Sequence, residues 1–101
     1  MPAFVLLTKL PPEAVRNPDE FRAAAHRVAD EIRRLQGVRW LSSYSVLGPY
    51  DIVDVFEAPD VETATQVALT IRSLAGVTTE TYAAVPWEGF LGIVGRVPPG
   101  Q

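Results

Sequence analysis

The chain has 101 residues, room for one domain, and its 48% hydrophobic and 21% charged residues exclude a disordered protein. The net charge of −3 and the scattered Lys and Arg exclude the basic stripe that binds phosphate backbones, so we expect no nucleic-acid partner. The sequence has no Cys and one His, which excludes disulfides and thiol catalysis, and we expect neither a metal nor a cofactor.

The first predicted element is a strand at residues 3–10, AFVLLTKL, which is apolar at nearly every position. This pattern is typical of a central strand, and Pro11 and Pro12 end it. The apolar run of residues 3–7 lacks the length and the basic flank of a signal peptide. No window approaches the roughly 20 apolar residues of a membrane span. We therefore predict a cytoplasmic protein without a membrane partner.

A helix is predicted next, within residues 17–37. Asn17 is expected as its N-cap and Pro18 as its first residue, and Glu20 completes a capping box. Gly37 is expected to end the helix in the left-handed conformation. The apolar stripe of this helix consists of Phe21, Ala24, Ala25, Val28, Ile32 and Leu35.

Two strands follow, at residues 38–47 and 52–58, joined by a four-residue connection at 48–51 that favours a type I turn. In simple register, one face of the pair carries Leu41, Ser43, Ser45 and Leu47 with Ile52, Asp54 and Phe56. The other face carries Trp40, Ser42, Tyr44 and Val46 with Val53, Val55 and Glu57. Both faces hold bulky apolar side chains, so the sequence leaves open which one the helices cover.

A second helix is predicted from its cap, Asp60, to Gly76, with a small-residue stripe on one side. Its outward side carries few charges, which indicates contact with another subunit or with the tail. A Thr-rich strand at residues 77–85 is the last predicted element. We expect the domain to span residues 1–90, and residues 91–101 to form an apolar C-terminal tail.

The predicted element order is β-α-β-β-α-β, and LQGV at 35–38 repeats as LAGV at 74–77. Two such halves predict an α+β, ferredoxin-like fold, an antiparallel four-stranded sheet with two helices on one face. The right-handed crossover rule places the first and third strands in the middle. The other face of the sheet is then bare and apolar, which predicts a homodimer or a higher homo-oligomer.

Three segments carry a family resemblance: LTKL at 7–10, LGPYDIVDVFEAPD at 47–60 and VPWEGF at 85–90. Together they resemble the GYD domain family, small proteins named for a Gly-x-Tyr-Asp turn, which here is Gly48, Tyr50 and Asp51. The resemblance implies a ferredoxin-like fold of the dimeric α+β barrel type, and it implies no reaction. A looser likeness exists to the effector-binding domains of leucine-responsive regulators, which bind amino acids at subunit contacts.

Several polar residues are candidates for a site. The only imidazole, His26, lies far from the apolar stripe and is expected on a solvated helix surface, within reach of Asp30. Asp54 stands out because it falls in the middle of a central strand, where a buried carboxylate must be hydrogen-bonded or raise its pKa. Its predicted cross-strand partner is Ser45. The expected ligand-binding residues are Tyr44, Tyr50, Asp51, Asp54 and Glu57, while Asp51 and Asp60 also have structural interpretations as turn and cap. Trp40 and Tyr82 are further candidates to line a cavity.

Two function classes fit these residues. The first is a ligand-binding or sensing module that holds a small molecule at the subunit interface without chemistry. The alternative is a small cofactor-independent isomerase, lyase or monooxygenase, with Asp54 or Glu57 within hydrogen-bond reach of Tyr44 or Tyr82. The sequence favours binding, because it shows no nucleophile-base pair. A structural subunit of a larger assembly is the third possibility.

Overall fold

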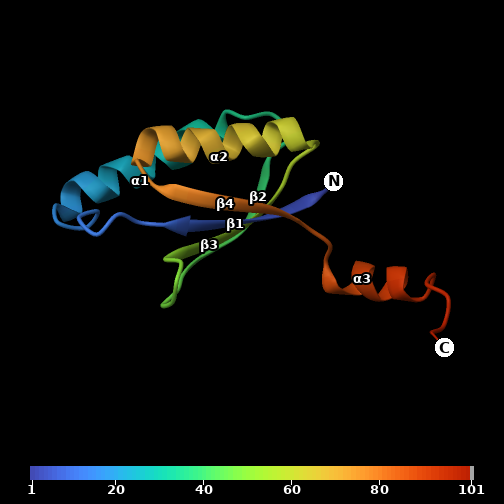
Figure 1. The fold of residues 1–101 in the computed structure, drawn as a ribbon. Helices are drawn as coiled ribbons and strands as arrows, with labels where there is room; N and C mark the ends of the chain where they lie inside the picture. Colours follow the sequence, from blue (N-terminus) through green and yellow to red (C-terminus); the bar gives the residue numbers. More distant parts are fainter. Residues whose placement is uncertain (101) are drawn as a thin grey trace.

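The computed structural model describes residues 1–100, and its fold is the predicted ferredoxin-like α+β architecture (Figure 1). The elements are β1 (Ala3–Lys9), α1 (Pro18–Arg33), β2 (Arg39–Ser45), β3 (Ile52–Glu57), α2 (Val61–Ala75), β4 (Thr78–Ala84) and α3 (Trp87–Val94). All strand pairs are antiparallel, and the order β2-β3-β1-β4 confirms that the first and third strands are central. Figure 1 shows α1 and α2 together on one side of this sheet.

The predicted helix starts are confirmed by side-chain caps. The Asn17 side chain accepts a hydrogen bond from the Glu20 N–H at 3.2 Å, and Asp60 accepts one from the Thr63 N–H at 2.7 Å. Gly76 ends α2 with a φ of 63°. Gly37 also has a positive φ, 82°, but α1 already ends at Arg33, so this glycine shapes the turn after the helix rather than its last residue.

The Asp60 cap makes stability depend on pH. Hydrogen bonding by Thr63, through its side chain and its N–H, holds the pKa of Asp60 below its ordinary value of 3.8. The cap therefore contributes stability above pH 3.8, and this contribution is lost as the pH falls through the lowered pKa. In thermal melts between neutral and strongly acidic pH, the melting temperature of Asp60→Asn should therefore fall less than that of wild type. Asn17→Ala is the control: it removes a cap that does not titrate, so it should lower the free energy of unfolding by about 1 kcal/mol at every pH. If wild type and Asp60→Asn had the same pH profile of melting temperature, Asp60 would not be the source of the pH dependence.

The hydrophobic core lies between α2 and the sheet. Its largest fully buried side chains are Leu6 of β1, Phe56 of β3 and Val67 of α2. The Phe56 ring stacks on Phe4 at a centroid distance of 5.6 Å and on Trp40 at 5.0 Å. The small residues of α2 allow this close packing, since Ala64, Val67, Ala68 and Ile71 are all buried, as their spacing predicts. The α1 stripe is less deeply covered, and Ile32 is its buried member.

The register of β2 and β3 differs from the simple one in two ways. The connection is six residues long, from 46 to 51, so Ser45 pairs with Ile52 and Asp54 lies opposite Ser43; the predicted Ser45 partner was wrong. A register shift between Trp40 and Ser42 forms a β-bulge at Leu41. Because a bulge reverses the alternation of side chains, Trp40 lies opposite Phe56 on the helix side, and its predicted place beside Tyr44 was wrong.

The opposite side of the sheet is covered by no part of the chain among residues 1–100. We call it the uncovered face, and the register places Val5, Leu7, Val53 and Val55 at its centre, each only half-buried. Tyr44 on β2 and Tyr82 on β4 flank these residues and are 65% and 50% exposed. The question that the sequence left open is thereby answered: the helices cover the face that carries Asp54 and Phe56.

Candidate ligand-binding site

A large pocket lies between α1 and the helix-covered face of the sheet. Its volume is about 870 Å³, within the range of small-molecule sites. Central strands provide part of its lining through Thr8, Ile52 and Asp54, and α1 provides another part through residues of its apolar stripe. We call this cavity the α1 pocket.

The composition of α1 explains why this space is not filled. Ala24, Ala25 and Ala29 line the pocket, and a methyl group is too short to bridge the distance between a helix and a sheet. Larger side chains, Phe21, Val28 and Ile32, border the same space. The stripe that the sequence identified as the core side of α1 is therefore also the apolar wall of a cavity.

Asp54 is the charged group of this pocket that is most deeply buried, with only 7% of its surface exposed. The Ser43 hydroxyl donates to Asp54 Oδ1 at 2.5 Å, and the indole Nε1–H of Trp40 donates to Ser43 Oγ at 2.8 Å. Three consecutive polar groups thus form a relay from the edge strand β2 to the central strand β3. Ser43 lies on this side by its pairing with Asp54, and Trp40 joins it only because the β2 bulge turns the indole toward the helices.

Burial raises the pKa of Asp54 above its ordinary value of 3.8, while the hydrogen bonds of Ser43 and Trp40 act in the opposite direction. A carboxylate in such a place costs folding free energy, because it gives up hydration that one hydroxyl only partly replaces. Within residues 1–100 the carboxylate accepts its hydrogen bond from Ser43 through Oδ1, and the Asp54 side chain lines the cavity. The arrangement can therefore accept a hydrogen bond from a bound molecule.

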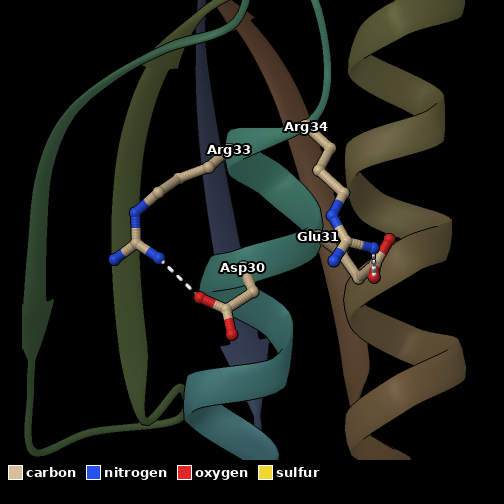
Figure 2. A network of polar contacts seen from close by, with 4 residues as sticks. All are labelled: Asp30, Glu31, Arg33 and Arg34. Carbon is tan, nitrogen blue, oxygen red and sulfur yellow. Dashed lines mark hydrogen bonds and ion pairs between the residues drawn. The ribbon is translucent and has the colours of Figure 1, made fainter.

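Charged side chains line the same pocket on α1, namely Glu20, Arg27 and Arg33. Figure 2 shows the end of this helix, where Arg33 extends toward the side of β2 and β3 and pairs with Asp30 at 2.8 Å. Arg34 pairs with Glu31 on the side of α2, at 2.7 Å. His26 is exposed as predicted, while Asp30, its expected neighbour in a pair, bonds Arg33. These exposed pairs contribute little to stability.

The Gly-x-Tyr-Asp turn connects three strands. The Asp51 carboxylate accepts a hydrogen bond from the Leu10 N–H at 2.7 Å, and its N–H donates to the Thr8 carbonyl at 2.8 Å. The Asp51 side chain thus holds the end of β1, while the Asp51 carbonyl accepts a hydrogen bond from the Val46 N–H at 2.9 Å and closes its own turn. The Tyr50 hydroxyl donates to Glu80 of β4, and the hydroxyl of Tyr82 donates to the other oxygen of Glu80.

Glu80 and its two tyrosines form a cluster on the side of the uncovered face. The two phenol donors hold the pKa of Glu80 below its ordinary value, and the same bonds to Glu80 raise the pKa of Tyr50 and of Tyr82. Sequence reasoning did not select Glu80. Its spacing of two residues from Tyr82 on one strand was the signal that could have identified the pair.

The structure does not bring the five expected ligand-binding residues into one place. Asp54 faces the α1 pocket, whereas Tyr44 and Glu57 lie on the uncovered face, across the sheet. Tyr50 and Asp51 lie at the end of the sheet, in the contacts described above. The carboxylate–tyrosine pair expected for an enzyme is not formed by Asp54, whose hydroxyl partner is Ser43. Among residues 1–100, no three His, Asp or Glu side chains are grouped as a metal site would require, and no helix is both long and apolar enough to span a membrane.

Comparison with known proteins identifies relatives of this chain. A Thermus thermophilus protein named glutamine synthetase and cystathionine beta-lyase binding protein is 38% identical over 90 residues, which are 85% of this chain and 90% of that protein. The crystal structure of TTHA0845, also from Thermus thermophilus, matches with a TM-score of 0.58 and 30% identity, over 85% of this chain and 95% of that chain.

A regulatory protein shares the fold. The leucine response regulatory protein LrpA of Mycobacterium tuberculosis matches with a TM-score of 0.55 and 26% identity. The match covers 84% of this chain and 50% of the LrpA chain. The profile of the GYD domain family matches residues 4–94, which include the turn at Gly48, Tyr50 and Asp51 and all seven elements. The chain therefore belongs to the GYD domain family.

Proposed function

We propose that this protein is a non-catalytic binding module that holds a small apolar molecule in the α1 pocket, with Asp54 as its polar anchor. The observation that carries the proposal is a buried carboxylate that lines an apolar cavity and accepts its hydrogen bond from Ser43 through one oxygen. The pocket accepts a flat or branched hydrocarbon body, and the carboxylate selects a hydrogen-bond donor. A primary amine fits best, because its ammonium group supplies a hydrogen-bond donor and a positive charge that stabilises ionised Asp54.

Binding without reaction is favoured by the surroundings of Asp54. A general base needs a reacting group near it and usually a second polar group that stabilises developing charge. The relay from Trp40 through Ser43 ends on the carboxylate and uses one of its oxygens for structure. The cavity wall beyond it is made mainly of alanine, aliphatic and Phe21 side chains of α1. The charged residues of α1 that also line the pocket, Glu20, Arg27 and Arg33, are exposed, and Arg33 is paired with Asp30.

The experiment uses the two tryptophans as internal reporters. The Trp40 indole N–H lies in the pocket relay, whereas Trp87 lies on α3 and is 67% exposed. In ¹⁵N-HSQC titrations with 2-phenylethylamine and n-hexylamine, we expect the Trp40 indole peak to shift and the Trp87 peak to stay. Carboxylic acids with the same carbon skeletons should shift neither peak.

Two matched variants separate the anchor from the fold. Asp54→Asn removes the charge, so it should weaken amine binding at least tenfold, about 1.4 kcal/mol. The melting temperature at neutral pH should stay equal or rise, because the variant no longer buries a charge. Ser43→Ala should weaken binding less, while Ser42→Ala, its neighbour on the other face, should not change it. Equal amine affinity for wild type and Asp54→Asn, or no Trp40 shift with any amine at millimolar concentration, would remove the support for this function.

We also propose self-association through the uncovered face, as a homodimer or a larger homo-oligomer. Supporting it are the four half-buried aliphatic side chains at the centre of that face, beside exposed Tyr44 and Tyr82. Contact there would bring Tyr44 and Glu57 of two copies together, and in this arrangement the ligand-binding role that the sequence predicts for these residues would be realised at the interface.

Binding of another protein is the second candidate function. The name of the Thermus relative states that it binds two enzymes, and this chain has exposed apolar surface on the sheet and on α3. Under this alternative the uncovered face would take a different protein in place of a second copy. The oligomeric state of the purified protein distinguishes the two.

A further inference from the structure

The helix α3 packs against no other part of the described chain. Every residue from 85 to 100 is exposed, although five of the eight residues of α3 are large and apolar: Trp87, Phe90, Leu91, Ile93 and Val94. Figure 1 shows α3 beyond the end of the sheet, on the side opposite α1 and α2. The apolar residues therefore lie on the same side of the molecule as the uncovered face.

A helix of this kind does not persist alone in water. Isolated helices shorter than about 12–15 residues are marginal even when their sequence favours helix. Eight residues that include Gly89 and Gly92, with no side-chain hydrogen bond at the N-cap, are still less favourable. The Trp87 ring stacks on Phe90 within the helix, at a centroid distance of 5.4 Å, and this contact is too small to hold it. A partner surface is needed.

The amount of exposed surface indicates how large the missing contact is. The chain has 7301 Å² of accessible surface, whereas a folded monomer of 11.0 kDa exposes about 5,600 Å². Its radius of gyration is 16.0 Å, against about 13 Å for a compact domain of this length. The excess of about 1,700 Å² matches the roughly 1,000–2,500 Å² that each subunit of an obligate dimer buries.

We propose that α3 is an arm that packs on the uncovered face of a second copy of this chain. The proposal rests on the self-association proposed above and adds the arm to it. The apolar residues of α3 and the uncovered face are both exposed in a single chain. In a dimer with a two-fold axis, the α3 of each copy can pack on the uncovered face of the other. The ring of Pro86 restricts its backbone φ, here −55°, and so stiffens the two-residue link between β4 and α3.

The first experiment measures mass by light scattering with the full chain. Wild type should be a dimer at micromolar concentration, and Phe90→Glu and Ile93→Glu should each shift it toward the 11.0 kDa monomer, raising the dissociation constant at least 100-fold. Val15→Glu changes an exposed apolar residue outside both surfaces and should leave the dimer intact. Circular dichroism checks the folding of the sheet and of α1 and α2, which α3 substitutions should preserve because they remove no core contact.

The second experiment locates the arm. The chain has no Cys, so Ile93→Cys can carry a single benzophenone maleimide, and this copy is mixed with ¹⁵N-labelled wild type before irradiation. Mass spectrometry should find cross-links from position 93 to ¹⁵N-labelled peptides of β1, β3 or β2. Cross-links confined to the same copy, or a dimer untouched by both glutamate variants, would overturn the arm. If α3 is shown not to be the arm but Val55→Lys still dissociates the dimer, the proposed contact through the uncovered face is supported without the arm.

Discussion

Replacing Phe56 with Ala is expected to lower the free energy of unfolding by about 3–5 kcal/mol, a large part of the about 5–15 kcal/mol that holds a domain together. Phe56 is fully buried and its ring is stacked between Phe4 and Trp40. Removal of the ring leaves a cavity and frees Trp40, which orients Ser43 toward Asp54. The loss should therefore reach the α1 pocket as well as the core.

The measurement is urea unfolding at one fixed protein concentration, because association adds to apparent stability. The midpoint should fall with an unchanged slope, and the melting temperature should drop by about 10 °C or more. Leu47→Ala is the control, since Leu47 is fully exposed in the loop between β2 and β3, and its effect should stay within about 0.5 kcal/mol. A loss below about 1 kcal/mol for Phe56→Ala would mean that this stack is not the centre of the core.

Replacing Val55 with Lys is expected to separate the subunits of the proposed dimer. Val55 lies on β3, between Val5 of β1 and Ser42 of β2 in the register, at the centre of the uncovered face. A lysine there would bring two positive charges together across a two-fold axis, in a place without water. We expect the dissociation constant to rise by at least 100-fold, about 2.8 kcal/mol, which is typical of a residue at the centre of an interface.

The stability of the separated chain should change little, because Val55 is only half-buried and the ammonium group can reach solvent once the partner is gone. Val15→Lys, an exposed apolar residue before α1, is the matched control and should stay dimeric. Sedimentation velocity over a concentration series gives the result. A Val55→Lys protein with the same mass and the same dissociation constant as wild type would show that the sheet face is not the contact.

The two proposed sites are connected through one feature of the sheet. The bulge at Leu41 places Trp40 in the α1 pocket and Tyr44 on the uncovered face of the same strand. Because β2 is an edge strand, a contact on Tyr44 and a ligand beside Trp40 act on backbone that is paired on one side only. An effect of dimerisation on amine affinity would be visible as a concentration-dependent shift of the Trp40 indole peak.

The fold could be predicted from local signals. Asn17 and Asp60 cap their helices as expected, Gly76 ends α2, and the order of elements with the crossover rule gives the sheet order. Such features depend on a few neighbouring residues, or on chirality that holds for every chain of L-residues. The family resemblance rested on three short segments, at 7–10, 47–60 and 85–90, which could be recognised for the same reason, since the residues of each are adjacent in the sequence.

The site required the tertiary structure. Asp54 was recognised as unusual from its place in a strand, but its partner was misassigned because the loop between β2 and β3 is longer than predicted. Trp40 was misplaced because of the bulge, and neither the loop length nor the bulge is marked by a distinctive residue. The pocket itself depends on the distance between α1 and the sheet, which many weak contacts decide together. Thus the sequence determined the elements, their order and the unusual carboxylate, because short-range chemistry governs them. Only the tertiary structure decided which side of the sheet holds Asp54, that α3 lies apart, and where a ligand has room, because these follow from packing summed over the whole chain.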